Sequence, residues 1–157
     1  MNVMTAPDPA KVHPLDIILV EDDDADAKAV RRALEKSCIA NPVRRLKDGV
    51  DALAFLRGEA PTKPPPQYII LLDLNMPRMN GIEFLEALRN DPKLHRAIVF
   101  VLTTSSDQRD IGNAYDHNVA GYILKDDAGF DFIKLVGTLD HFWHVVELPE
   151  IPAGGGR

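Results

Sequence analysis

Polar residues that could carry phosphate or metal chemistry stand directly after apolar stretches of the chain. They are Glu21 and Asp22 after 16–20, Asp73 after 68–72, Thr103 after 97–102 and Lys125 after 119–124. Three carboxylates brought together would repel one another, and a hard divalent cation such as Mg²⁺, which prefers oxygen ligands, would relieve that repulsion. An aspartate beside such a cation can be the nucleophile toward a phosphoryl group. Lys125 would then pair with a phosphate oxygen, and the Thr103 hydroxyl would donate to another.

Each of these residues also has an ordinary structural interpretation. A lone aspartate at a strand end commonly caps the following turn, and a lone lysine there is a surface residue. In the acidic run 21–26, helix capping by Asp24 and a favourable first-turn charge on Asp26 explain two of the acids. Capping explains Glu21 and Asp22 poorly, because these two acids precede the helix and continue the strand. The functional interpretation therefore depends on whether the strand ends meet.

The stretch Tyr68–Leu72 predicts the central element of the fold. Its uninterrupted apolar residues are typical of a strand buried on both faces of a parallel sheet. Pro77 cannot extend the hydrogen-bond ladder, so the strand has to end before it. Asp73 is thereby predicted at the carboxyl end of a central strand, where ligands bind in open α/β sheets.

The rest of the chain predicts alternating strands and helices. We expect strands over 16–20, 42–47, 68–72, 97–102 and 119–124, and helices over 24–37, 50–56, 82–90, 107–117 and 128–147. Five such units predict an α/β fold in three α/β/α layers, with a doubly wound parallel sheet of strand order 2-1-3-4-5. In this arrangement all the candidate residues fall on one edge of the sheet.

Composition limits the organisation of the chain and its partners. The 157 residues suit one domain, predicted over 15–149 between a flexible leader, 1–14, and a flexible tail, 150–157. A net charge of −6 argues against nucleic acid as a direct partner. The single cysteine, Cys38, fits a reducing compartment, and we expect the cytoplasm. No apolar run approaches the roughly 18 residues of a membrane span.

Four ordered motifs resemble the receiver domain of two-component response regulators, which has a flavodoxin-like fold. They are Val20–Asp22, Leu72–Gly81, Val101–Thr103 and Gly121–Lys125. The resemblance implies that Asp73 accepts a phosphoryl group from a sensor histidine kinase. It implies Mg²⁺ held by Glu21, Asp22, Asp73 and the backbone carbonyl of Asn75. It also implies that Thr103 and Lys125 contact the phosphoryl group and that Tyr122 is an aromatic switch residue.

Finer features resemble the single-domain regulators that partner cyanobacterial and bacterial phytochromes. These features are the acidic run 21–26, the segment 102–106 and the ending 142–149. The resemblance implies a bacteriophytochrome as the kinase partner. One position departs from the family pattern, because Asp126 follows Lys125 where receivers usually carry proline. A trans bond is expected there, since a cis bond before a non-proline residue costs about 3 kcal/mol.

Three classes of function are compared on this basis. We favour a phosphoacceptor signalling module, which is not an enzyme beyond its own phosphorylation and dephosphorylation. The alternatives are a degenerate receiver that serves only as a binding scaffold and an aspartyl-phosphate hydrolase. Against the hydrolase, Asn75 stands where such enzymes commonly carry a second acid, and no cap insertion is visible. About ten residues follow the last predicted helix, so we expect the signal to leave through protein contacts.

The last predicted helix, 128–147, carries two apolar stripes where one sheet face needs one. A second stripe left exposed would favour association. We therefore expect a homodimer through the face built by 107–117, 119–124 and 128–147. The alternative is that the segment around Pro149 folds back and covers the second stripe within one chain.

Overall fold

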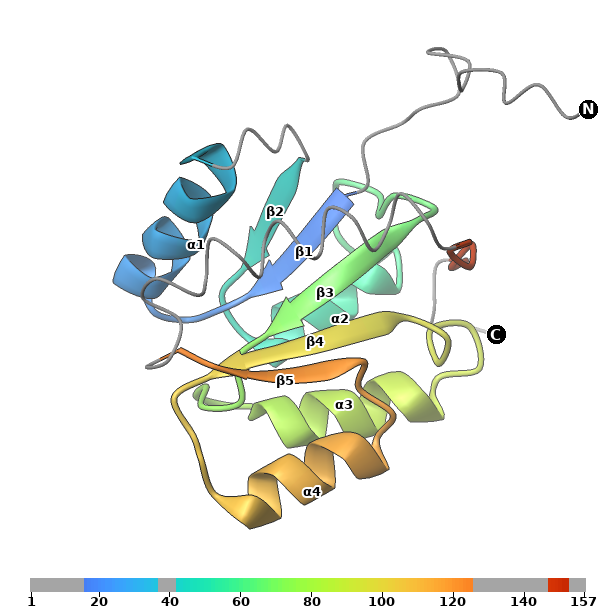
Figure 1. Cartoon of the computed structure of the whole chain (residues 1–157). Helices are drawn as coiled ribbons and strands as arrows, with labels where there is room; N and C mark the ends of the chain where they lie inside the picture. Colours follow the sequence, from blue (N-terminus) through green and yellow to red (C-terminus); the bar gives the residue numbers. More distant parts are fainter. Residues whose placement is uncertain (1–15, 37–41, 126–146, 153–157) are drawn as a thin grey trace, which may run out of the picture.

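The computed structural model describes residues 16–36, 42–125 and 147–152. Its strands are β1 (Asp16–Val20), β2 (Val43–Leu46), β3 (Tyr68–Leu72), β4 (Ile98–Thr103) and β5 (Gly121–Leu124). Its helices are α1 (Asp24–Lys36), α2 (Gly49–Leu56), α3 (Gly81–Asn90) and α4 (Gln108–Asp116). All strand pairs are parallel, and the order β2-β1-β3-β4-β5 confirms the predicted sheet (Figure 1). The helix predicted over 128–147 lies outside the described residues.

The strands divide their side chains between two apolar clusters, as the period of a strand requires. Even-numbered residues of β1 and β3, such as Ile18 and Ile70, pack with α2, α3 and α4 on one face of the sheet. Odd-numbered ones, such as Leu19 and Leu71, pack with α1 on the other. Helices therefore lie on both faces, which confirms the α/β/α layers.

The sheet register brings the strand ends to one level. Val20 pairs with Leu72, and Leu72 pairs with Val101, so the residues that follow β1 and β3 emerge side by side. The Asp73 amide continues this ladder by donating to the Val20 carbonyl at 3.0 Å. β4 runs one residue further than predicted, so that Thr103 is its last residue.

The connection from β3 to α3 is tight at Gly81. A Cβ at this position would come within 2.6 Å of the Leu74 Cα and 2.7 Å of the Asp73 carbonyl oxygen, so only glycine fits. Asn80 caps α3 by accepting from the Glu83 amide, and the Glu83 side chain accepts from the Asn80 amide in return. The backbone after Asp73 is thus held by packing and by a capping box.

The segment 147–152 packs further into the domain than expected. Ile151 is only 4% exposed, and its amide donates to the Pro66 carbonyl at 2.7 Å. Leu148 packs against the α1-side cluster and accepts a bond from Gln67 through its carbonyl. The domain boundary at 149 stays a prediction, and Ile151 shows that contacts with the domain continue beyond it, which an isolated isoleucine among prolines does not signal in the sequence.

None of the helices in the described ranges is long and apolar enough to cross a membrane.

Candidate functional site

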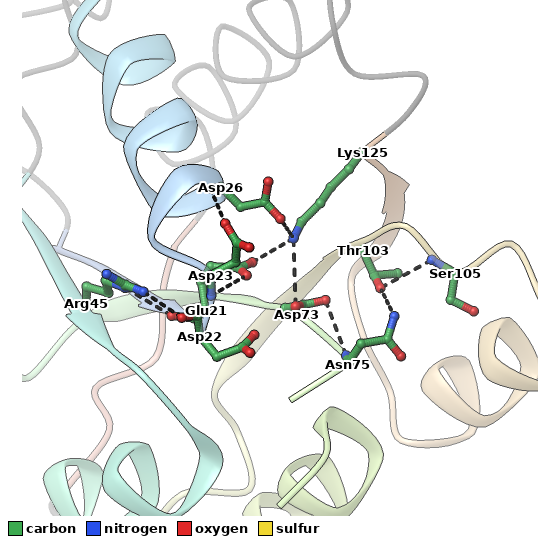
Figure 2. Close-up of polar contacts among 10 residues, drawn as sticks. All are labelled: Glu21, Asp22, Asp23, Asp26, Arg45, Asp73, Asn75, Thr103, Ser105 and Lys125. Carbon is green, nitrogen blue, oxygen red and sulfur yellow. Dashed lines mark hydrogen bonds and ion pairs between the residues drawn. The ribbon is translucent and has the colours of Figure 1, made fainter. Parts of the chain in front are cut away.

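Three carboxylates from two neighbouring strand ends meet at the carboxyl edge of the sheet. Oxygen atoms of Glu21, Asp22 and Asp73 all lie within 4.8 Å of one another (Figure 2). Glu21 is 1% exposed and Asp73 is 6% exposed, whereas Asp22 is more open to solvent. A compact set of carboxylate oxygens with one open side fits a hard divalent cation such as Mg²⁺.

Lys125 reaches into this acidic cluster from the end of β5. Its Nζ lies 2.7 Å from Glu21 Oε2, 2.8 Å from Asp26 Oδ2 and 3.7 Å from Asp73 Oδ2. Burial alone would lower the pKa of Lys125, but the hydrogen bonds to Asp26 and Glu21 outweigh it and hold the pKa above its usual range. The ammonium is therefore charged, and its two closest partners are Glu21 and Asp26.

The pKa of Glu21 reflects the burial and the crowding of negative charge at this edge. Burial, with a further contribution from the charge of Asp73, raises the pKa of Glu21 to about 7, even though Lys125 and the Asp23 amide favour the ionised form. Lys125 alone does not compensate the burial of the Glu21 carboxylate. A bound divalent cation would supply the missing positive charge.

The acids of the run 21–26 have separate structural tasks. Asp23, and not Asp24 as predicted, caps α1, since its Oδ1 accepts from the Asp26 amide at 2.9 Å. The helix begins one residue earlier than a cap at Asp24 would allow. Asp24 instead pairs with Arg45 at 2.6 Å. The Asp26 side chain points back to Lys125, away from its own helix (Figure 2).

Arg45 on β2 is a residue of the site that the sequence did not reveal. Its Nε donates to the Glu21 carbonyl at 3.0 Å, and its Nη2 donates to the Asp22 carbonyl at 3.1 Å. The guanidinium thus holds the backbone of the two acids that follow β1. The available signal was a basic residue on the strand next to β1, but its relevance depends on the register that pairs Arg45 with Leu19.

Thr103 lies fully buried on the far side of Asp73. Its hydroxyl oxygen accepts from the Asn75 side-chain amide at 3.5 Å and from the Ser105 amide at 3.4 Å. The Asn75 backbone amide donates to Asp73 Oδ1 at 3.3 Å. Asn75 therefore touches both the predicted phosphoacceptor and the predicted phosphoryl contact.

Tyr122 is connected to Thr103 through Ser105. The tyrosine hydroxyl donates to the Ser105 carbonyl at 2.7 Å, and the Ser105 hydroxyl donates to Asp110 Oδ2 on α4 at 2.6 Å. Partial burial raises the pKa of Tyr122, although its bond to Ser105 opposes the shift. The segment after β4 thus links the buried threonine, the half-buried tyrosine and α4.

An open cleft of about 440 Å³ adjoins the acidic cluster. Its lining residues come from both sides of the site: Asp22, Leu74, Asn75, Met76, Pro77, Asn80, Ile82 and Asp110. Two of the predicted metal-binding residues, Asp22 and Asn75, therefore face the same solvent-accessible space.

The structure brings together every candidate residue that the sequence predicted at this edge. Asp126, the departure from the family pattern, lies outside the described residues, so its trans peptide bond stays a prediction. Lys125 nevertheless reaches Glu21, and its Nζ lies near Asp73.

Comparison with known proteins gives one consistent family. Residues 17–136 match the family model described as response regulator receiver domain. The chain is 40% identical over 139 residues to the response regulator Rcp1 of Synechocystis sp., an alignment that covers 87% of this chain and 94% of Rcp1.

Solved structures agree with the sequence comparison. The crystal structure of the Mn²⁺-bound form of Rcp1 superposes with a TM-score of 0.75 at 37% identity, covering 87% of this chain and 99% of that one. The phosphorylated cyanobacterial phytochrome response regulator RcpA also gives a TM-score of 0.75, at 36% identity, covering 88% and 100%. One of these similar structures thus holds a divalent metal and the other is phosphorylated.

Proposed function

The chain belongs to the family of response regulator receiver domains, and from this premise we propose that Asp73 accepts a phosphoryl group from the phosphohistidine of a sensor kinase. The observation that carries the proposal is the placement of Asp73. It is a buried carboxylate at the end of the central strand, with oxygen atoms of two further acids within 4.8 Å and an ammonium at 3.7 Å. Carboxylates collected this closely suit a hard divalent cation, which would offset the charge of an incoming phosphoryl group.

The transfer is a nucleophilic displacement at phosphorus. A carboxylate oxygen of Asp73 attacks the phosphorus, an O–P bond forms, and the P–N bond to the kinase imidazole breaks with its electron pair left on the ring nitrogen. Lys125 and Thr103 contact the transferred group and offset its negative charge. Glu21, Asp22, Asp73 and the backbone carbonyl of Asn75 would hold Mg²⁺. When bound, this cation supplies positive charge at the phosphoryl oxygens.

The signal leaves the site through Thr103 and Tyr122. On phosphorylation the Thr103 hydroxyl turns to a phosphoryl oxygen and gives up its contacts with Asn75 and the Ser105 amide. Tyr122, whose hydroxyl donates to the Ser105 carbonyl in the unphosphorylated protein, then moves into the space that Thr103 leaves. The new contact of Thr103 supplies the difference in free energy between the two conformations that such a switch requires.

A bacteriophytochrome is the proposed kinase partner. The support is the similarity to RcpA, whose description names it a phytochrome response regulator. We place the protein in the cytoplasm, where a kinase finds ATP. Direct contact with nucleic acid is not part of the proposal, since the net charge of −6 opposes binding to phosphate backbones.

A homodimer through α4, β5 and the predicted helix 128–147 is the proposed assembly. The support for it is the second apolar stripe predicted for 128–147, which would be exposed in a monomer. The segment around Pro149 does fold back against the domain, at Pro66 and Gln67. Whether it also covers the second stripe of 128–147 concerns residues outside the described ranges.

The scaffold and hydrolase alternatives are not favoured. A scaffold has no need of the acids and the lysine that meet at Asp73, and the amide of Asn75 occupies the place where a hydrolase would need a second acid beside the cleft.

Intact mass after incubation with acetyl phosphate and Mg²⁺ tests the proposed function. The wild type should gain the mass of one phosphoryl group, and Asp73→Asn should gain none. Asp107→Asn is the matched control, because it removes an exposed helix-capping carboxylate at the same edge and should leave the gain unchanged. The same mass gain in Asp73→Asn as in the wild type would show that the phosphoacceptor is another residue.

A further inference from the structure

Lys125 is bound more closely by two other acids than by the phosphoacceptor. Its Nζ lies 2.7 Å from Glu21 and 2.8 Å from Asp26, but 3.7 Å from Asp73 (Figure 2). Its two hydrogen bonds go to Glu21 and Asp26, and 3.7 Å is too long for one to Asp73, so the ammonium must move to contact a group on Asp73 and thereby lengthens a present contact. A phosphoryl group on Asp73 has to draw the ammonium from one of its present partners.

The two partners differ in how easily they release the lysine. The Glu21 side chain is 1% exposed, so loss of Lys125 would leave a carboxylate that water cannot reach and that only a bound divalent cation would offset. The Asp26 side chain is 44% exposed, so water can replace the ammonium there. Asp26 is also free of capping duty, because Asp23 caps the helix. The contact with Asp26 is therefore the one that can be given up.

We propose that Asp26 is a positioning residue that holds Lys125 away from Asp73 in the unphosphorylated protein and yields it to the phosphoryl group. This inference rests on the proposed function, since it concerns the anion that Asp73 would carry. Asp26 then acts as a reversible counter-anion. It stabilises the unphosphorylated conformation and sets how strongly an anion on Asp73 must attract Lys125, because a ligand shifts an equilibrium only by its differential affinity for the two states.

The binding of beryllofluoride, a mimic of the phosphoryl group, measures this competition. Titrated in the presence of MgCl₂, Asp26→Asn should bind beryllofluoride about fivefold more tightly than the wild type, a size typical of coupling between contacting charged groups. Asp23→Asn is the control. This substitution removes one negative charge from the same loop and keeps a good capping residue. Because the ion-pair partners of Lys125 are Glu21, Asp26 and Asp73, the change in affinity should be clearly smaller.

A double-mutant cycle with Lys125→Gln separates the lysine contact from a general effect of charge. In the Lys125→Gln background, Asp26→Asn should no longer tighten binding. The ¹⁵Nζ resonance of Lys125, recorded without beryllofluoride, should move in Asp26→Asn and stay in place in Asp23→Asn. An equal tightening in the two single variants, or an effect that persists in the Lys125→Gln background, would overturn the proposal.

These measurements also distinguish the inference from the proposed function. A wild type that binds no beryllofluoride with Mg²⁺ would count against phosphoryl acceptance at Asp73. The Nζ resonance of Lys125 would then still show whether Lys125 contacts Asp26 in the unphosphorylated protein. An unchanged resonance in Asp26→Asn would refute the role of Asp26.

Discussion

The two edges of the sheet deal with buried charge in opposite ways. At the amino-end edge, Asp91 is 6% exposed, and its carboxylate accepts from the Lys93 and Leu94 amides at 2.8 and 3.3 Å and pairs with Arg57 at 3.3 Å. At the carboxyl-end edge, Glu21 is buried beside Asp73 with Lys125 as the shared cation, and its pKa is raised to about 7. The buried charge at the amino-end edge is thus compensated by its neighbours, whereas the carboxyl-end edge keeps an excess of negative charge.

Arg89 completes the compensated edge. Its guanidinium, half-buried at the end of α3, donates to four backbone carbonyls: those of His95, Ala97, His117 and Asn118. These carbonyls belong to the segments that lead into β4 and β5, and Asn118 has a left-handed backbone with φ 59°. A single side chain thus secures the entry of two strands. The comparison teaches that this fold gains stability at the edge that does no chemistry and gives some up at the edge that does.

Breaking the compensated edge should have the largest effect on stability. Arg89→Met leaves four carbonyls without their donor, and we expect it to lower the free energy of unfolding by about 3–5 kcal/mol, since hydrogen bonds to a charged group contribute about 1.5–3 kcal/mol each and do not add in full. Urea denaturation measures the loss. Mg²⁺ affinity of the folded variant should be unchanged, because the metal-binding residues lie at the opposite edge.

Arg109→Met is the control for Arg89, because Arg109 has a side chain that is 88% exposed. Its stability should match that of the wild type. A loss in Arg89→Met no larger than in this control would mean that the carbonyl contacts contribute nothing, and the contrast between the edges would fail.

Removing one buried charge from the carboxyl-end edge should raise the free energy of unfolding, by less than Arg89→Met lowers it. In the folded, metal-free protein the pKa of Glu21 is raised from 4.5 to about 7. The folded state therefore holds the proton more tightly than the unfolded state, so this stabilisation is complete below pH 4.5 and is lost as pH rises to about 7. Glu21→Gln should then exceed the wild type by about 2 kcal/mol at pH 8 without metal and lose the advantage below pH 5.

Added Mg²⁺ should reverse the ranking. The cation stabilises the wild type by binding the folded state, whereas Glu21→Gln lacks one of the ligands and gains less. Thermal melts at pH 5 and pH 8, with EDTA or with MgCl₂, measure all four conditions. A glutamine variant less stable than the wild type at pH 8 in EDTA would show that Glu21 is compensated after all.

How far the sequence predicts each edge follows from the kind of contact involved. Asp73 was predictable because an apolar strand ends at it, and parallel strand ends must share an edge. Arg45 and Arg89 were not, because their long side chains reach carbonyls that are 24 and 28 residues away in the chain, and such contacts depend on sheet register. The sequence does not single out Asp23 as the cap, because three successive aspartates give the same signal and only the geometry of the first turn selects one of them.

The smallest predicted effect concerns Arg45, and its sign separates positioning from charge. Arg45 lies next to the proposed metal site, so by charge alone its removal should strengthen Mg²⁺ binding, and removal of the Asp24 charge should weaken it. The hydrogen bonds predict the opposite order. Arg45 holds the carbonyls of Glu21 and Asp22, and Asp24 only pairs with the outer side of the guanidinium.

We therefore expect Arg45→Met to weaken Mg²⁺ binding about tenfold, as is typical when a residue that orients metal ligands is lost. Asp24→Asn should change the affinity by no more than about twofold, since exposed ion pairs contribute little. Isothermal titration with MgCl₂ at pH 8 measures both, at a pH where Glu21 is mostly ionised. If Arg45→Met binds Mg²⁺ more tightly than the wild type, the field of the guanidinium outweighs its contacts. The Mg²⁺ affinity at the carboxyl-end edge would then be set by total charge rather than by the geometry of the metal ligands.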